Sequence, residues 1–395
     1  MNRAMHNKAI QRIIILISWG IMAWPHGTWA DWQPKASLQQ QVGYEDNMRL
    51  DVRNGESVFT YRLIPALEAA RKTGNSDLIF KADGDIRRNN DSRWDCDNFN
   101  IASDDAYRHG RAETGLAGSY THSCAYLQQL LDIGIIRPRL DYRTLKLSPN
   151  WSWQWTPRDK LTTAATYSRT TYQNNASDPA TRFTGNETWL FNIGERHQWN
   201  PRLSLDGELF LRDIHYDSQN IPNQTVYGVQ LGGQYQVNRT LKFTLDAGPG
   251  MVYTHSGEAI SAYSRWGYVV NIGGIYEGER QALSAGYSNA INPSALGQVL
   301  QYHTLYARYR YRLKPALMLE VETRYNRMES ITRNVSSTAF ERDYATASLG
   351  LDWNITRDLR IRLNYGYRFQ EYAAFPGQAH SNSIILGLSY VFLGT

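Results

Sequence analysis

Cysteine is nearly absent from this sequence, which has only Cys96 and Cys124 among its 395 residues. Two cysteines exclude a disulfide-dense scaffold and a cysteine-based zinc module. Neither stands at the end of the N-terminal segment in the position of a lipobox, which argues against a lipoprotein. Beyond that segment the sequence has no apolar run long enough for a membrane-spanning helix, and its mean hydropathy is negative. These absences exclude a helical membrane protein and a small disulfide-rich domain.

Catalytic signatures are absent as well. The sequence has no H-E-x-x-H, G-x-S-x-G, P-loop or C-x-x-C motif, and its nine histidines are scattered. Asp83 and Asp85 have strand spacing and could flank a glycosidic bond. Lys81 and Arg87 bracket them, however, which favours solvated charges. We therefore predict no enzyme activity, no catalytic residues, no metal and no cofactor.

The N-terminus has the features of an export signal. Three basic residues in the first twelve precede an apolar run, 13–23, that is too short to span a bilayer. Thr28-Trp29-Ala30 then offers a small-x-small cleavage site. We predict a signal peptide over residues 1–30 and a mature domain over 31–395. Export and a net charge of only +5 disfavour nucleic-acid binding, although the charge permits an anionic partner.

Alternation with the period of a β-strand fills the chain from Pro34 onward. In residues 359–369, large apolar side chains occupy the odd positions, and arginines stand at 360, 362 and 368. Successive side chains of a strand point to opposite faces, so each segment has an apolar and a charged face. Such charges would be costly in a dry core but suit a wet lumen. The pattern predicts an all-β fold, namely a single transmembrane antiparallel β-barrel.

Short turns recur along the chain and alternate with longer polar stretches. Examples are 155–161, 199–203, 313–317 and 353–359, each with an apolar residue before the turn and Leu after it. Short periplasmic turns and long extracellular loops are typical of a bacterial barrel. We count about 18 strands, with 16 possible because 88–150 is irregular. The expected strands begin near Pro34, Ser57, Ser76, Arg108, Cys124, Arg137, Lys160, Gly185, Arg202, Thr225, Thr240, Tyr263, Gln281, Tyr302, Leu317, Arg342, Asp358 and Asn382.

The irregular region determines what we expect of the cysteines. Residues 89–106 are rich in Asp and Asn and are predicted to form a long extracellular loop. This places Cys96 in that loop and Cys124 near a periplasmic turn. The apolar band of a barrel is roughly 25 Å tall, so the two could not form a disulfide.

Arginines on the predicted lumen face are the main functional candidates. Arg308, Arg310 and Arg312 precede the turn at 314–316, which places Arg310 opposite Glu320 and Arg308 opposite Glu322. Such pairs predict a structural ladder of ion pairs. Other rows have few acids beside them and are candidates for contact with an anionic solute: Arg360, Arg362 and Arg368, and a further row of Arg137, Arg139 and Arg143, relieved by Asp141.

The last segment, 383–392, has large apolar residues at every second position and ends at Phe392. It resembles the closing strand of bacterial outer-membrane barrels, which in that group is the assembly signal. The resemblance implies this role for Phe392 and Tyr390, although three further residues follow.

A wider resemblance rests on the start of the mature chain. Val42-Gly43-Tyr44-Glu45-Asp46-Asn47-Met48 and, in the next segment, Leu63-Ile64-Pro65-Ala66-Leu67 resemble the outer-membrane β-barrel porins encoded in exopolysaccharide (capsule) biosynthesis loci. The resemblance implies a bacterial outer-membrane conduit for a polysaccharide. The arginines of the predicted lumen favour an anionic polysaccharide. It also implies outer-membrane lipid and periplasmic or inner-membrane secretion proteins as partners. A small-solute porin and a plugged structural or enzymatic barrel are the alternatives.

Overall fold

The computed structural model describes residues 32–53, 55–124, 140–173, 183–218, 220–256, 262–293, 299–331, 341–373 and 377–393. The signal peptide predicted over 1–30 lies outside these residues. The strands are β1 (Trp32–Glu45), β2 (Val58–Lys72), β3 (Ser76–Asn89), β4 (Cys96–His109), β5 (Ala112–Cys124), β6 (Asp141–Gln154), β7 (Asp159–Gln173), β8 (Asn186–Asn200), β9 (Leu203–Tyr216), β10 (Gln224–Gln236), β11 (Leu241–Thr254), β12 (Tyr263–Glu277), β13 (Gln281–Pro293), β14 (Val299–Lys314), β15 (Leu317–Ser330), β16 (Arg342–Asn354), β17 (Leu359–Tyr372) and β18 (Gln378–Leu393).

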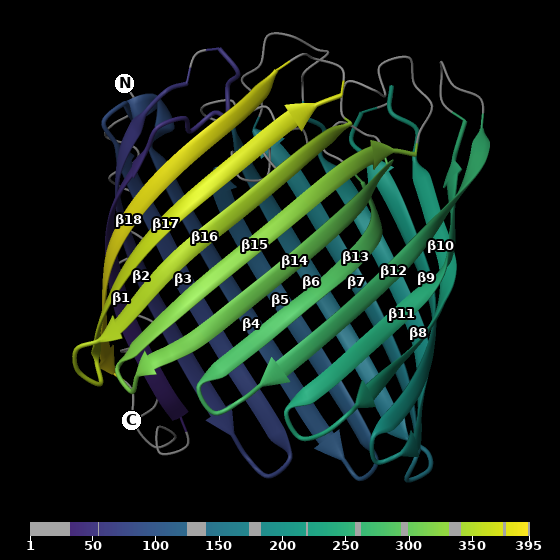
Figure 1. Ribbon diagram of the computed structural model, residues 1–395. Coiled ribbons are helices and arrows are strands. Elements are labelled where there is room, and N and C mark those ends of the chain that lie inside the picture. The colour runs from purple at the N-terminus through teal and green to yellow at the C-terminus, as the bar shows by residue number, and fades with distance from the viewer. Residues whose placement is uncertain are drawn as a thin grey trace, which may run out of the picture.

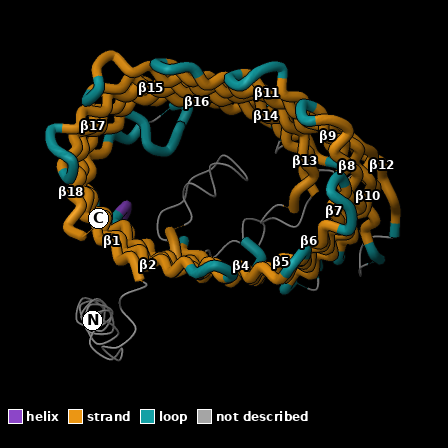
Figure 2. The backbone as a smooth tube through the Cα atoms, turned by 90° about the horizontal axis from the view of Figure 1, so that it is seen from below, coloured by secondary structure: helices purple, strands orange, loops and turns teal. Residues whose placement is uncertain are grey.

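The strands form one closed antiparallel sheet. Each strand pairs with its neighbour in the chain, and β1 pairs with both β2 and β18. Short turns join the strands at one end of the barrel, and the longer connections lie at the other end (Figure 1). Seen along its axis, the barrel is flattened, with β15 and β16 facing β4 and β5 across the lumen (Figure 2). The predicted barrel of 18 strands is confirmed. No helix among the described residues is long and apolar enough to cross a membrane.

The two faces of the sheet differ as the alternation predicts. On β17, Leu363 and Tyr365 are 46% and 44% exposed and pair with Leu386 and Ile384 of β18. Arg362, which precedes Leu363 in the chain, points to the other face. The exposed apolar residues continue around the outside of the barrel, as in Trp189, Phe191 and Ile193 of β8. A continuous apolar outer face requires lipid as its solvent.

The region 88–124 corrects the prediction. Residues 96–109 form β4, so the connection after β3 is short and holds only the 3₁₀ turn η2 (Ser92–Trp94). The predicted strand starts near Arg108, Cys124 and Arg137 are therefore wrong, since these strands begin at residues 96, 112 and 141. The Asp and Asn residues were misleading because polar side chains in a barrel strand are solvated by the lumen rather than by a loop.

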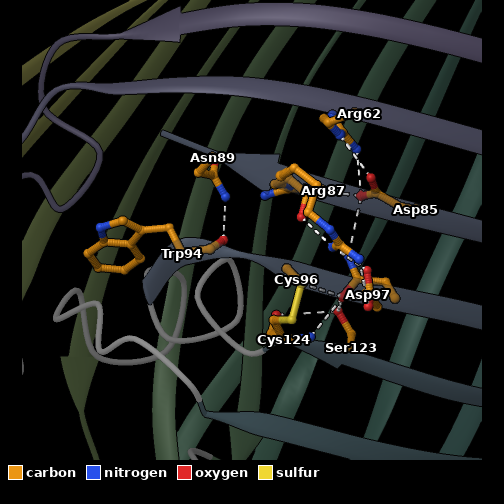
Figure 3. The surroundings of a disulfide bond; sticks show 11 residues. Arg62, Asp85, Arg87, Asn89, Trp94, Cys96, Asp97, Ser123 and Cys124 are labelled. Carbon is orange, nitrogen blue, oxygen red and sulfur yellow. Dashed lines mark hydrogen bonds and ion pairs between the residues drawn. A yellow bond between two sulfur atoms is a disulfide. The ribbon is translucent and has the colours of Figure 1, made fainter. Parts of the chain in front are cut away.

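The corrected register brings the two cysteines together. Cys96 opens β4 and Cys124 closes β5 at the same end of the barrel, and they form a disulfide with Cα atoms 5.9 Å apart (Figure 3). The expectation that they could not bond is wrong. The bond lies at the upper end of the hairpin, where it ties the start of β4 to the end of β5.

Two buried clusters lie within the upper part of the lumen. The first joins Met48 and Leu50, which follow β1, to lumen-facing residues of β2, β16 and β18 and to the region of the disulfide: Val58, Trp94, Cys96, Tyr344 and Ala379. The second joins the adjacent ends of β13 and β14 to β9, β10 and β11: Ile214, Tyr216, Val226, Val252, Ile291, Val299 and Ile331. Apolar side chains are buried there because residues 48 and 50 in the first cluster, and the ends of β13 and β14 in the second, pack against lumen-facing side chains of the wall.

Candidate functional site: the wall of the lumen

The arginines of β14 lie on its lumen face. β14 and β15 pair in the predicted register, with Arg308 opposite Glu322 and Arg310 opposite Glu320. Arg308 forms the expected ion pair, with Nη2 2.6 Å from Oε2 of Glu322. Arg310 and Arg312 are exposed, and neither has an acidic partner in the part of the chain that the structure describes.

The expected ion pair of Arg310 with Glu320 is replaced by a different one. Arg362 of β17 reaches across β16, placing Nη2 3.2 Å from Oε1 of Glu320 and Nε 3.7 Å from Oδ1 of Asp352. Arg362 is thus compensated by two carboxylates, and Arg310 is left without one. This contact could not be predicted from strand pairing because Glu320 and Arg362 belong to strands that are not adjacent.

Arg360 lies two residues before Arg362, closer to the turn that precedes β17, and its contacts differ from those of Arg362. Its Nε donates to Oδ1 of Asn354 at 2.9 Å, and it is exposed with no ion pair among the described residues. Arg324 on the lumen face of β15 is likewise exposed and has no ion pair there. We call Arg310, Arg312, Arg324 and Arg360 the open arginines.

Arg368 does not have the role that its spacing suggests. Its guanidinium forms an ion pair with Glu45 of β1, and Nη2 donates to the backbone oxygen of Met48 at 3.2 Å. The side chain is only 18% exposed. Arg368 therefore fastens the chain that leaves β1 and is not available to a solute.

The structure describes only one residue of the predicted row Arg137, Arg139 and Arg143. Arg137 and Arg139 lie outside the described residues. Arg143 pairs with His122 and shares the face of β6 that carries Leu145 and Leu147, which is the outer face. Arg143 is thus a residue of the outer rim. Its assignment to the lumen is wrong because Tyr142, Thr144 and Lys146 occupy the lumen face of β6, and Arg143 alternates with them.

The segment 46–52, here called the inner segment, is held inside the barrel by its first two residues. Asn47 Nδ2 donates to the backbone oxygens of Asp51 (2.9 Å) and His380 (3.0 Å), and its Oδ1 accepts from the Asp51 amide at 3.0 Å. Asp46 accepts from the backbone and side-chain amides of Asn382 at 2.7 and 2.8 Å. Burial alone would raise the pKa of Asp46, but these hydrogen bonds outweigh it and lower the pKa.

These contacts explain the motif on which the resemblance rests. Asp46 and Asn47 belong to the motif that carries the resemblance, and they anchor the inner segment to β18 at the seam where the barrel closes. Pro65, the other element of the motif, coincides with a gap in the ladder between β2 and β3, whose pairing passes from Leu63 directly to Ala66. A proline has no N–H for such a ladder.

A second anchor was not found from the sequence. Arg212 on the lumen face of β9 donates from Nη1 to the backbone oxygen of Ile291 (2.7 Å) and to Oδ1 of Asn292 (3.0 Å). It holds the end of β13 against the second buried cluster. The signal was hidden because Arg212 shares the alternating pattern of any lumen arginine.

The remaining wall is chemically uneven. Asp206 and Glu208 of β9 and Asp246 of β11 form an acidic group on either side of Gly232. The wall of β5 to β8 has few charges and is lined by hydroxyl groups. A cavity of about 520 Å³ lies against it, bounded mainly by Ser119, Thr121, Thr144, Thr166, Ser168, Thr170 and Thr188, with Tyr142, Tyr172 and Lys146.

Groups that might have carried chemistry have structural partners. Asp85 forms ion pairs with Arg62 (2.7 Å) and Arg87 (3.0 Å), and its side chain is only 16% exposed, so its charge is compensated within the wall rather than solvated (Figure 3). His303 Nδ1 lies 2.8 Å from the Tyr287 hydroxyl on the outer face. Within the described ranges, no group of His, Cys, Asp and Glu is arranged to hold a metal ion.

Comparison with known proteins gives one family and a common architecture. Residues 125–384 match the family model described as TonB dependent receptor-like, beta-barrel. OccAB4 of Acinetobacter baumannii superposes with a TM-score of 0.50 at 10% identity, over 91% of this chain and 98% of that chain. The FrpB iron transporter of Neisseria meningitidis gives 0.50 at 9% identity, over 91% and 81%. At such identities the likeness shows the fold alone. No curated protein matches the sequence.

Proposed function

Because the chain belongs to the family of TonB-dependent receptor-like β-barrels, we propose that it is a passive porin for small hydrophilic solutes that favours anions. The chain is a bacterial outer-membrane β-barrel of the transporter and porin type. The expected outer-membrane location is confirmed. The association with exopolysaccharide loci remains a proposal.

The two buried clusters support a small solute. Leu50 of the inner segment and Val299 at the start of β14 are only 2% and 0% exposed, so the residues of both clusters are packed against the wall. β1 and β10 are nine strands apart in a ring of 18, which places the two clusters on opposite sides of the lumen. Packed protein on both sides narrows the upper lumen, which suits a small solute better than a polymer.

The open arginines support selectivity for anions, and they are the observation that carries the proposal. They lie on β14, β15 and β17, so their charges add on one side of the lumen. An arginine in an ion pair presents little net charge to the lumen, whereas an exposed, unpaired arginine attracts an anion that moves past it. Several weak sites in succession assist conduction, because a single tight site would retain the solute.

Bilayer conductance tests this proposal. Two unit charges about 8 Å apart in water interact by ~0.5 kcal/mol before salt screening. We expect Arg310→Gln, Arg312→Gln and Arg360→Gln together to lower the chloride-to-potassium permeability ratio roughly fivefold. A matched control replaces three ion-paired arginines of the outer face, Arg88, Arg169 and Arg327, by Gln. A ratio that stays the same in the lumen variant, or falls equally in the control, contradicts the assignment.

One observation favours the polysaccharide conduit as a second candidate. The hydroxyl-lined wall of β5 to β8 offers donors and acceptors along the cavity of about 520 Å³, as a chain of sugar hydroxyls requires. Current recordings with added oligosaccharides separate the two functions. Brief, length-dependent blockage by charged oligosaccharides supports the conduit, and passage restricted to mono- and disaccharides in a swelling assay supports the porin. Absence of any conductance supports the plugged barrel.

A further inference from the structure

The turn end of the barrel carries a ring of unpaired cations. Eight tight turns join β2–β3, β4–β5, β6–β7, β8–β9, β10–β11, β12–β13, β14–β15 and β16–β17. Each has an exposed basic side chain in the turn or at the strand residue that leads into it: Lys72, Arg111, Arg158, Arg202, Arg239, Arg280, Lys314 and Arg357. We call these residues the cationic ring. The turns themselves contain few acids, Glu279 and Asp358 being the examples.

The ring residues lie beyond ion-pair distance of the described carboxylates, although Asp159 interacts electrostatically with its neighbour Arg158. Among the residues that the structure describes, none of the eight forms an ion pair, and Arg111 bonds instead to the backbone oxygen of Trp155 at 3.3 Å. Arginines on the outer face at the opposite end differ. Arg88 lies 2.6 Å from Asp97, and Arg327 lies 2.8 Å from Glu329. The charges of the ring are thus left for an anion from outside the chain.

A belt of aromatic residues fixes the depth of the ring. Seven of the eight cations follow an aromatic residue by three or four positions: Tyr107, Trp155, Trp199, Tyr235, Tyr276, Tyr311 and Trp353. Five of these are among the exposed large side chains of the barrel, and Trp199 is 61% exposed. Tyr and Trp concentrate at the level of the lipid headgroups. A cation only three or four residues further along a tight turn therefore lies at the level of the headgroup phosphates.

We propose that the cationic ring binds the phosphates of anionic phospholipids in the periplasmic leaflet, and that it fixes the depth and orientation of the barrel. A guanidinium offers a planar pair of N–H donors that matches two phosphate oxygens. Six of the eight cations are arginines, which suits this geometry. A ring that surrounds the whole barrel fits a continuous lipid surface better than a partner protein, which would contact one sector.

Spin-labelled lipids test the inference. The purified barrel is placed in phosphatidylcholine bilayers with spin-labelled phosphatidylglycerol or phosphatidylcholine, and the motionally restricted fraction gives the relative association constant. A basic residue near the membrane surface raises the local occupancy of an anionic headgroup about fivefold over that of a neutral one. Because the signal averages over all lipids around the barrel, we expect Arg158→Gln, Arg239→Gln and Arg357→Gln together to lower the preference for phosphatidylglycerol about twofold.

Two further variants make the result decisive. The same three positions changed to Lys should keep most of the preference, because the charge remains. The lumen variant Arg310→Gln, Arg312→Gln and Arg360→Gln loses the same charge away from lipid and should keep all of it. Heat-modifiable gel mobility establishes that each variant is folded. No preference in the unaltered barrel, or a preference that the Gln substitutions at the ring do not change, overturns the inference.

Discussion

Replacing Asn47 with Ala should loosen the inner segment without unfolding the barrel. The Asn47 side chain makes three hydrogen bonds, two with Asp51 and one with the backbone oxygen of His380. Each contributes about 1 kcal/mol net, so the substitution removes roughly 3 kcal/mol from the docked state. Since 1.4 kcal/mol is a factor of ten, local opening should become about 100-fold more frequent.

The remaining contacts limit the effect to opening. Met48 and Leu50 are 7% and 2% exposed, and burial of such side chains contributes about 2 kcal/mol each. Arg368 still holds Glu45 and the Met48 oxygen. The segment should therefore stay docked most of the time, so its average position changes little and its dynamics change greatly.

Hydrogen exchange measures this directly. The Asp51 amide donates to Oδ1 of Asn47 at 3.0 Å, so it should exchange much faster in the variant, as should the peptide covering 46–52. Open-channel current noise should rise as well, because the segment lies within the lumen. Asn200→Ala is the control, since Asn200 accepts from the Arg202 and Leu203 amides at the turn end. Unchanged exchange over 46–52, or an equal rise throughout the barrel, would refute the reasoning.

Two other predictions concern the wall and its closure. The disulfide closes a loop of 28 residues, and the chain entropy it removes from the unfolded state stabilises the fold by about 3.5 kcal/mol. Cys96→Ser together with Cys124→Ser should therefore lower the urea midpoint of unfolding. Reductant should lower the midpoint of the unaltered protein and have no effect on the variant. Phe392 is 56% exposed on the outer face of β18, with its ring centroid 4.8 Å from that of Tyr390. The assembly role implied by the resemblance predicts that Phe392→Ser lowers the fraction of heat-modifiable barrel in outer membranes. Val391→Thr, on the lumen face of the same strand, should leave that fraction unchanged.

The sequence was sufficient for the architecture because a barrel is specified locally. Alternation assigned Leu363 to lipid and Arg362 to the lumen without knowledge of any neighbour. The tight turn at 315–316 fixed the register of Arg308 with Glu322, because short turns leave little freedom in pairing. Local rules failed at 89–106, where lumen-facing Asn and Asp imitate a loop, and the misplaced strands then separated two cysteines that are bonded.

The candidate site was harder to predict than the fold because it depends on contacts between distant strands. Arg360 and Arg368 have the same spacing on β17 and look equivalent in the sequence. Arg368 is neutralised by Glu45, 323 residues away, whose position is set by the closure of the barrel through β1 and β18. No periodicity within one strand contains that information.

The state of each arginine, rather than their number, therefore assigns their roles. Arg368 holds the chain that leaves β1, and Arg212 holds the end of β13. Arg308 and Arg362 form ion pairs with carboxylates of the wall, and Arg310, Arg312 and Arg360 remain exposed. A solute can be attracted only by charge that the protein has not already neutralised. Removing a paired arginine should therefore affect stability or gating, whereas removing an exposed one should affect selectivity alone. A variant such as Arg360→Gln that destabilised the barrel but left selectivity intact would show that exposure does not distinguish these roles.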